Sequence, residues 1–304
     1  MIKRTLYFEN PAYLSLKNQQ LVVKYPTVEN EVENTKTVPI EDIGIVILAN
    51  QPITITHGAI AALLDNNCAI VTCNSRNFMP QGLLLNLEGN TLQSERFTAQ
   101  IKASQPLKKQ LWQQTIQAKI TNQAYVLSAA RNVVVDNMKV WANNTKSGDS
   151  ENMEARAAVY YWSKLFPQIL LFTRNREGVP PNNLLNYGYA VLRAVVARSL
   201  VISGLLPTLG IHHHNRYNAY CLADDIMEPY RPFVDKLVVE TVDSGADFQE
   251  LSKEIKVKLL NIPVLDVIIN GQRSPLMIAA SQTTASLAKC FLGESRKVAY
   301  PSFE

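Results

Sequence analysis

The chain has 304 residues, of which 47% are hydrophobic, and its 30 Lys and Arg against 26 Asp and Glu give a formal net charge of +4. This length is long for one hydrophobic core, so two domains are expected. The small positive excess only weakly indicates nucleic-acid binding, and no run of about 18 uncharged apolar residues predicts a membrane span.

Residues 1–90 are predicted to form a β-rich domain. Turn signals separate short aliphatic and β-branched runs, and one helix is expected among them at 57–65. Gly89-Asn90 is the expected boundary of this domain. The predicted strands lie at 14–16, 21–23, 43–48, 53–55, 69–72 and 82–85.

Residues 91–304 are predicted to form a larger all-α domain, which makes the fold class α+β. From residue 94 onward the apolar spacing is helical, as in Leu107, Leu111, Ile116 and Ile120. Further helical stretches are expected at 153–166, 183–204, 222–243, 249–260 and 275–292.

The two predicted domains differ in charge. Residues 1–90 hold six Lys and Arg against eight Asp and Glu, which leaves 24 against 18 for the remainder. Because phosphates attract positive charge, DNA binding is expected in the helical domain. The β-rich domain is the better candidate for pairing of subunits.

A short span of the helical domain gathers imidazole and carboxylate groups. The segment 209–214 ends in three consecutive histidines, and Asp225 and Glu228 follow it. Three residues apart on a helix, these two acids share one face and repel each other, so a cation is expected between them. Pro229 and Pro232 are expected to bend or reset the helix just past Glu228. A divalent metal suits this set of groups.

Glu154 is the candidate for a further carboxylate ligand. Its neighbours in the segment 153–162 are mostly small, apolar or aromatic. A lone acid in such surroundings loses hydration unless it is paired or bound to metal.

Each of these residues also has a simpler interpretation. The histidines are compatible with a solvated loop or with zinc, and the acids near 225 with a helix N-terminus, where they complement the macrodipole. Glu154 is equally compatible with an ordinary helical pair with an arginine. Arg174 and Arg193 are candidates for a DNA groove, although solvated helix faces are commoner.

The cysteines and the first residues of the chain indicate the cellular compartment of the protein. Cys68, Cys73, Cys221 and Cys290 form no C-x-x-C pair, so neither a zinc knuckle nor a redox motif is indicated. The first eight residues lack a long apolar region of the kind found in export signals. A cytoplasmic location with reduced thiols is therefore expected.

Three blocks of sequence resemble the CRISPR-associated integrase-endonuclease family, Cas protein one. They are 154–158, 183–192, and the run 206–213 with its continuation to residue 235. The blocks occur in the family's order, and the similarity covers nearly the whole chain. The two adjacent histidines at 212–213 and the motif Met-Glu-Pro-Tyr-Arg-Pro at 227–232 are most similar to the type II branch.

The resemblance implies a set of site residues. The family's metal ligands fall on Glu154, on a histidine of the Gly-Ile-His-His segment, and on Glu228. The family pattern Leu-Gly-aromatic-x-His selects His213 as that histidine. Asp225 is expected to orient the site from behind the ligands, and Arg231 to hold a DNA phosphate, although a salt bridge to a nearby acid is as good an interpretation.

The resemblance also implies the chemistry. A site with Mg²⁺ or Mn²⁺ would activate a DNA 3′-hydroxyl for strand transfer, or water for hydrolysis, and would insert short DNA fragments into a CRISPR array. The implied partners are double-stranded DNA, a second copy of the chain as a homodimer, Cas protein two, and other type II adaptation proteins. Two alternatives are a catalytically silent DNA-binding subunit and, ranked lowest, a zinc hydrolase built on the three histidines.

Overall fold

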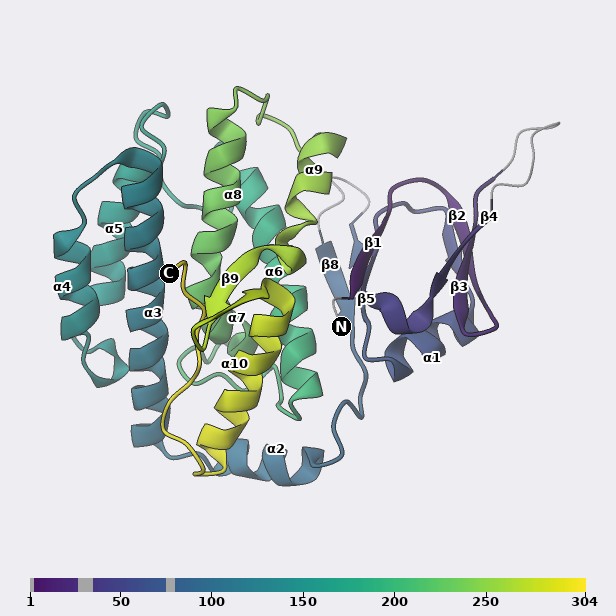
Figure 1. The fold of residues 1–304 in the computed structure, drawn as a ribbon, viewed down its shortest axis with the longest axis horizontal. Helices are drawn as coiled ribbons and strands as arrows, with labels where there is room; N and C mark the ends of the chain where they lie inside the picture. Colours follow the sequence, from purple (N-terminus) through teal and green to yellow (C-terminus); the bar gives the residue numbers. More distant parts are fainter. Residues whose placement is uncertain (1–2, 27–34, 75–79) are drawn as a thin grey trace. The chain divides into compact units, whose positions relative to one another are not determined.

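The computed structural model describes residues 3–26, 35–74 and 80–304. The chain divides into two compact units, Met1–Gly89 and Asn90–Glu304. The first is rich in strands and the second is mainly helical (Figure 1). The expected order, a β-rich part followed by a larger helical part, is therefore confirmed.

Two four-stranded sheets form the first unit. In one, with the order β1-β5-β7-β8, the first three strands are parallel and β8 is antiparallel to β7. In the other, with the order β4-β3-β2-β6, only β2 and β6 are parallel. The strands span Arg4–Phe8 (β1), Ala12–Lys17 (β2), Gln20–Lys24 (β3), Thr35–Pro39 (β4), Ile43–Leu48 (β5), Ile53–Ile55 (β6), Ala69–Cys73 (β7) and Pro80–Leu84 (β8).

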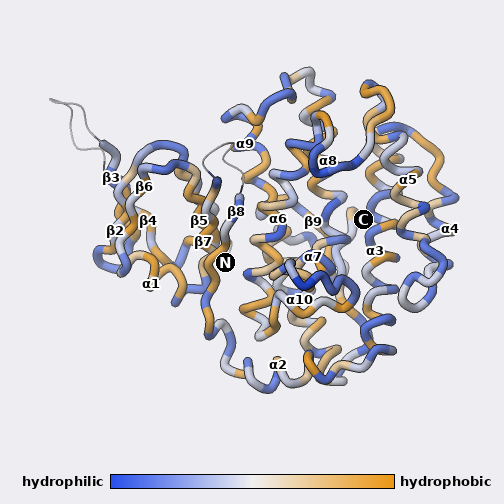
Figure 2. Tube along the Cα trace, turned by 180° about the vertical axis from the view of Figure 1, so that it is seen from behind, coloured by the Kyte–Doolittle hydropathy of each residue, from blue (hydrophilic) through white to orange (hydrophobic). Residues whose placement is uncertain are grey.

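The helix of this unit, α1 (His57–Asp65), has the bounds that the sequence predicted. The Thr56 hydroxyl accepts a hydrogen bond from Ala59 N at 3.4 Å and caps the helix. Apolar side chains of α1 and the strands pack together, and β5 and β7 show as hydrophobic in Figure 2. The unit therefore has a core of its own, which includes Leu14, Leu21, Ile43, Val46, Ala59, Leu63 and Ile70.

The second unit consists mainly of α-helices joined by loops and short 3-10 turns. Its α-helices span Gln93–Lys102 (α2), Gln105–Arg131 (α3), Asp136–Asn144 (α4), Met153–Leu165 (α5), Asn182–Ile202 (α6), Cys221–Met227 (α7), Arg231–Asp243 (α8), Lys253–Leu259 (α9) and Leu276–Phe291 (α10). The 3-10 turns span Ser147–Asp149 (η2), Glu228–Tyr230 (η3) and Ile262–Val264 (η4), and one more, Ile40–Asp42 (η1), lies in the first unit.

The sequence analysis expected this unit to be all-α, but it also contains a pair of strands. Strands β9 (Asp266–Ile269) and β10 (Gln272–Pro275) pair as an antiparallel hairpin before α10. The turn residues Asn270 and Gly271 have φ of 52° and 73°. Asn-Gly tolerates these left-handed conformations, which two-residue hairpin turns require.

Helix α6 is the core helix of the second unit. It is long and apolar enough to cross a membrane, but 72% of its most apolar window is buried inside the protein. It packs against α7, α8, α9 and α10. A Cβ at Gly188 would lie 2.5 Å from Val234 Cγ1 of α8, so glycine allows this close approach. Burial in protein therefore explains its hydropathy.

Helix α3 connects the elements that carry the candidate site. It lies beside α4, α5 and α8 (Figure 1) and also packs against the turn η3. Ser104 caps its start, since its hydroxyl accepts a hydrogen bond from Leu107 N at 3.4 Å. Past Glu228 the helix resets as expected: α7 ends at Met227, η3 contains Pro229, and α8 begins with Pro232 in its first turn.

Candidate active site

Three charged side chains from three elements meet in the helical unit. Glu154 lies in the first turn of α5, Glu228 begins η3, and Lys119 lies on α3. The Lys119 ammonium Nζ is 2.6 Å from Glu154 Oε1 and 2.6 Å from Glu228 Oε2. Lys119 therefore joins the two glutamates that the resemblance assigns as metal ligands.

Arg231 adds a second positive charge to this group. Its Nε lies 3.0 Å from Glu228 Oε1, and its guanidinium lies 4.7 Å from the centre of the Tyr189 ring. Burial would raise the pKa of Glu228, but Arg231 and Lys119 outweigh burial and hold the pKa below its usual value. Burial would lower the pKa of Lys119, but Glu228 and Glu154 raise it. Glu228 and Lys119 are therefore charged at neutral pH.

Glu154 is held in place by a cap at the start of α5. The carboxylate of Asp149, in η2, accepts hydrogen bonds from Met153 N at 2.8 Å and from Glu154 N at 3.0 Å. These amides have no partner within the helix, so the acid completes the first turn. Asp149 is itself buried. The cap fixes the backbone from which the Glu154 side chain projects.

Glu228 is held through the backbone that follows it. The Asn122 side chain of α3 donates to Pro229 O at 2.8 Å and to Pro301 O at 2.9 Å. The Tyr230 hydroxyl lies 2.6 Å from the Thr283 hydroxyl of α10. The turn η3 is therefore tied on both sides, which fixes the position of Glu228.

A buried carboxylate organises the histidine loop. Asp225 Oδ2 accepts hydrogen bonds from Ile211 N at 2.8 Å and His212 N at 2.9 Å. Its Oδ1 lies 2.5 Å from His213 Nδ1. A Cβ at Gly210 would lie 2.3 Å from His213 O, so the tight loop requires glycine there. This arrangement leaves His213 Nε2 as the nitrogen not used by Asp225.

The neighbouring histidine has a different environment. The His212 ring stacks on Trp112 with ring centres 4.1 Å apart and planes 1° from parallel. Burial, and then His213, lower the pKa of His212. The hydrogen bond to Asp225 raises the pKa of His213 against the effect of burial, and Glu228 and Glu154 raise it further. The negative charges of both glutamates therefore favour the protonated form of His213.

Asp225 and Glu228 do not share one cation as the helical spacing suggested. Asp225 binds the histidine loop, while Glu228 binds Lys119 and Arg231. Within residues 3–26, 35–74 and 80–304, no three His, Cys, Asp or Glu side chains lie close enough together to hold a metal ion in this structure. The three-ligand set of Glu154, His213 and Glu228 therefore stays a prediction.

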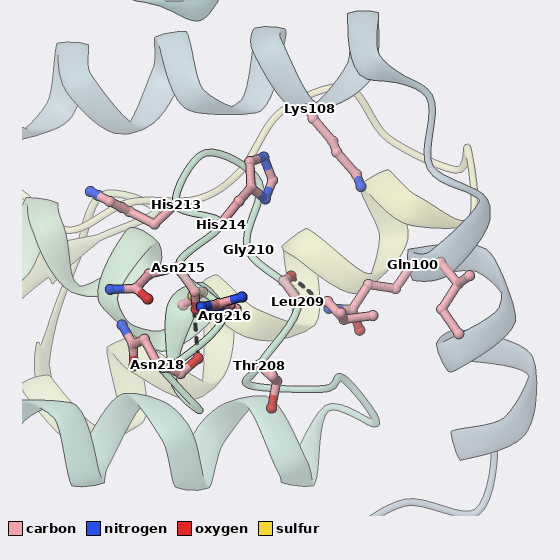
Figure 3. A pocket seen from close by; sticks show the side chains of 12 residues that line it. Gln100, Lys108, Thr208, Leu209, Gly210, His213, His214, Asn215, Arg216 and Asn218 are labelled. Atoms are coloured by element: carbon pink, nitrogen blue, oxygen red, sulfur yellow. Dashed lines mark hydrogen bonds between the residues drawn. The ribbon is translucent and has the colours of Figure 1, made fainter.

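A pocket of about 400 Å³ lies beside His213 (Figure 3). Gln100 of α2 donates to Leu209 O at 3.1 Å and so ties the wall of the pocket to that helix. Lys108 extends from α3, and Arg216 lies on the loop. Among the described residues that line it there is no carboxylate, so the pocket favours an anion. Its remaining lining residues are Ile101, Thr208, Gly210, His214, Asn215, Asn218 and Cys221.

The arginines considered for DNA binding have protein partners. Arg193 pairs with Asp224 through two hydrogen bonds, of 2.7 Å and 3.1 Å. Arg174 donates to Asn182 at 3.0 Å and to Asn186 at 2.7 Å. Arg231 forms a salt bridge to Glu228, which was the alternative to a phosphate contact in the sequence analysis. Its binding to a DNA phosphate stays a prediction.

The sequence analysis missed two residues of the site, Lys119 and Asp149. A signal existed for Lys119, since it continues the buried stripe of α3 formed by Trp112, Thr115 and Ile116. A lysine on an apolar stripe requires an acidic partner. Asp149 precedes the α5 helix by four residues, outside the usual capping spacing, so its sequence position gave no such signal.

Comparisons with known proteins identify the family of this chain. The family model for CRISPR associated protein Cas1 matches residues 6–259. A CRISPR-associated endonuclease Cas1 of Neisseria meningitidis is 36% identical over 287 residues, which cover 94% of this chain and 91% of that protein. A second, from Saccharolobus solfataricus, is 30% identical over 255 residues, which cover 80% and 76%.

Solved structures share the fold. A casposase bound to integration product has a TM-score of 0.78 at 19% identity, covering 98% of this chain and 92% of that chain. A Cas1 protein from Thermotoga maritima has a TM-score of 0.74 at 17% identity, covering 96% and 98%. The family match over most of the length and the sequence identity to curated relatives lead to one conclusion: the chain belongs to the Cas1 family of CRISPR-associated proteins.

Proposed function

We propose that this protein is a divalent-metal-dependent DNA endonuclease and integrase that inserts short DNA fragments as spacers into a CRISPR array. The observation that carries the proposal is the meeting of Glu154 and Glu228, from separate elements, at one ammonium group, that of Lys119. Membership of the Cas1 family and the fold shared with an integration-product complex support it.

The donor types of the predicted ligands suit a hard divalent cation. Two glutamate oxygens already surround one positive charge, the Lys119 ammonium, in a largely buried position. Carboxylate oxygens with one imidazole suit Mg²⁺ and Mn²⁺ alike. We infer that Glu154, Glu228 and His213 Nε2 hold the ion. When bound, Mg²⁺ or Mn²⁺ would act as a Lewis acid on the phosphodiester and on the attacking hydroxyl.

The chain's own residues would orient the reaction. Asp225 fixes the His213 ring through Nδ1, and the Asp149 cap fixes the backbone of Glu154. Lys108 and Arg216, in the pocket beside His213, provide positive charge for DNA phosphates. Arg231 would bind a further phosphate. Attack by a DNA 3′-hydroxyl gives strand transfer, and attack by water gives cleavage.

The proposed partners follow from the same assignment. Double-stranded DNA is the substrate, as spacer fragment and as repeat. One chain of a Cas6-RT-Cas1–Cas2 complex shares this fold over 35% of its length, with a TM-score of 0.73, and this supports pairing with Cas protein two. We infer a homodimer as the integrating unit and association with the other adaptation proteins of a type II system.

A strand-transfer assay on a labelled DNA duplex, with and without Mn²⁺, tests the proposal. Metal-dependent joined product is expected from the wild-type protein and not from Glu228→Ala, which should still bind DNA. Tight DNA binding without joining in any divalent metal would support the alternative, a catalytically silent DNA-binding subunit. The zinc hydrolase is disfavoured because His212 stacks on Trp112 while His213 binds Asp225, so the rings serve different partners.

A further inference from the structure

The Lys119 ammonium lies where a cation held by the two glutamates would lie. Its side chain is 11% exposed, and its ammonium contacts one oxygen of each glutamate at 2.6 Å. It reaches them from α3, a different element from those that carry either acid. Without a cation there, two carboxylates would face each other across a few ångströms in a poorly hydrated position.

An ammonium and a divalent ion cannot both occupy this point. Oxygen ligands of Mg²⁺ lie at about 2.0–2.1 Å from the ion. A metal bound by Glu154 Oε1 and Glu228 Oε2 would therefore lie within about 4.7 Å of the present position of Lys119 Nζ, the sum of the two contact distances, and the two cations would repel each other. Metal loading therefore favours displacement of the ammonium. The Glu154 side is open to this movement, because its side chain is 27% exposed against 6% for Glu228.

We propose that Lys119 is a built-in counter-cation: it occupies the Glu154–Glu228 pair in the metal-free protein, gives up that place to the divalent ion, and then binds a DNA phosphate. The inference rests on the proposed metal site. A displaced ammonium is repelled by the bound ion and has lost both anions, so a phosphate is the partner that stabilises it. DNA should therefore favour metal binding, and by linkage metal should favour DNA binding by the same factor.

The test compares Lys119→Met with Lys109→Met. Lys109 is exposed on the same helix, so its substitution removes the same charge without touching the glutamates. Titration calorimetry measures the Mn²⁺ dissociation constant of each protein without DNA. Relative to the wild type, Lys119→Met is expected to bind Mn²⁺ at least about tenfold more tightly, which lies within usual coupling strengths, and Lys109→Met is expected to be unchanged. Glu228→Gln should abolish binding in both backgrounds.

A second measurement concerns DNA. Fluorescence anisotropy gives the affinity for a labelled duplex with saturating Mn²⁺ and with EDTA. Mn²⁺ should tighten DNA binding by the wild-type protein, and Lys119→Met should reduce this gain by about tenfold. An undiminished gain in Lys119→Met would overturn the transfer of the ammonium to phosphate.

A crystal structure of the wild-type protein soaked in Mn²⁺ requires no variant and covers the case in which Lys119→Met does not fold. The ion is expected between the two glutamates with Lys119 Nζ moved away. Mn²⁺ bound by both glutamates with Nζ still in contact with them would overturn the inference and leave the metal site intact, as would an unchanged Mn²⁺ affinity in Lys119→Met. Absence of Mn²⁺ binding in the wild type and Lys119→Met alike would overturn the metal site itself.

Discussion

The His213 ring is held by a different contact from those of the two neighbouring histidines. Asp225 holds its ring through Nδ1, whereas His212 stacks on Trp112 and His214 lines the pocket. We predict that His213→Ala reduces the rate of strand joining by more than about 100-fold. Substitution of a residue that only hydrogen-bonds a metal ligand typically costs about 10- to 100-fold, and loss of the ligand itself should cost more. His214→Ala should reduce it much less. The measurement is joined product per unit time at saturating Mn²⁺.

His212→Ala serves as the matched control for this series. Loss of the stacked ring should lower the free energy of unfolding by about 0.5–1.5 kcal/mol without removing a ligand. Thermal melts separate this effect from chemistry. Equal losses of joining at all three histidines, or a loss confined to His212, would show that the ligand register is wrong.

At this scale the sequence selected residues that the structure brings together, and their role as metal ligands stays a prediction. The two glutamates lie far apart in the sequence, yet the resemblance selected both, and the structure joins them through one ammonium. The spacing argument failed for Asp225, because its carboxylate satisfies loop amides that no helical periodicity describes. Lys119 was missed because the prediction for this helix used only its apolar residues, such as Ile116 and Ile120, between which the lysine lies.

At the scale of elements, the start of α5 links stability to the site. We predict that Asp149→Ala lowers the free energy of unfolding by about 0.5–2 kcal/mol, the usual range for a lost cap. Mn²⁺ affinity should fall as well, because Glu154 N loses its partner and the first turn frays. Denaturant unfolding and titration calorimetry measure the two effects.

Asp136→Ala is the matched control for this cap. Asp136 begins α4, and its side chain is 80% exposed. Its removal should change neither unfolding nor Mn²⁺ affinity appreciably. If Asp149→Ala lowers the free energy of unfolding as predicted but leaves the Mn²⁺ affinity unchanged, the cap stabilises the helix without positioning the Glu154 ligand.

A buried carboxylate joins three helices near the site. Asp235 of α8 accepts hydrogen bonds from Tyr161 of α5 at 3.0 Å and from Tyr189 of α6 at 2.5 Å. Burial raises its pKa to about 6, although both tyrosines, Arg174 and Arg231 act in the opposite direction. The folded protein therefore binds this proton more tightly than the unfolded chain does.

This shift predicts a pH dependence of stability. Between the usual pKa of 3.8 and about 6, the unfolded chain has lost the proton and the folded protein has kept it, so the contribution of Asp235 to stability falls as pH rises. A shift of roughly two pH units corresponds to about 3 kcal/mol. The wild-type free energy of unfolding minus that of Asp235→Asn should decline by this order across the interval. A flat difference would show that Asp235 stays ionised in the fold.

The elements show how far local sequence patterns reach. Helix α1 agrees with its predicted bounds because its cap and its apolar spacing are both local. The stretch 222–243 became two helices and a 3-10 turn, as the prolines required. The hairpin of β9 and β10 was missed although Asn270-Gly271 is a strong turn signal, because its strands of four residues are too short for a clear alternation.

At the scale of the whole molecule, the two units differ in net charge. Residues 1–90 hold two more acids than bases, and the remainder holds six more bases than acids. The strand-rich unit ends at Gly89 and has its own core. The helical unit carries the candidate site, Lys108 and Arg216. We therefore assign DNA affinity to the helical unit, and infer that the strand-rich unit serves pairing of subunits.

This division predicts how binding responds to salt and to truncation. Because bound phosphates release counterions, contact with about four phosphates should weaken whole-chain binding on the order of 100-fold between about 50 and 200 mM salt. A fragment of residues 90–304, once circular dichroism shows that it is folded, should keep most of this salt dependence. The fragment 1–89 should bind duplex DNA far more weakly. Fragment 1–89 binding as tightly as the whole chain, or whole-chain binding insensitive to salt, would contradict the assignment, because neither result is compatible with phosphate contacts made by the positively charged unit.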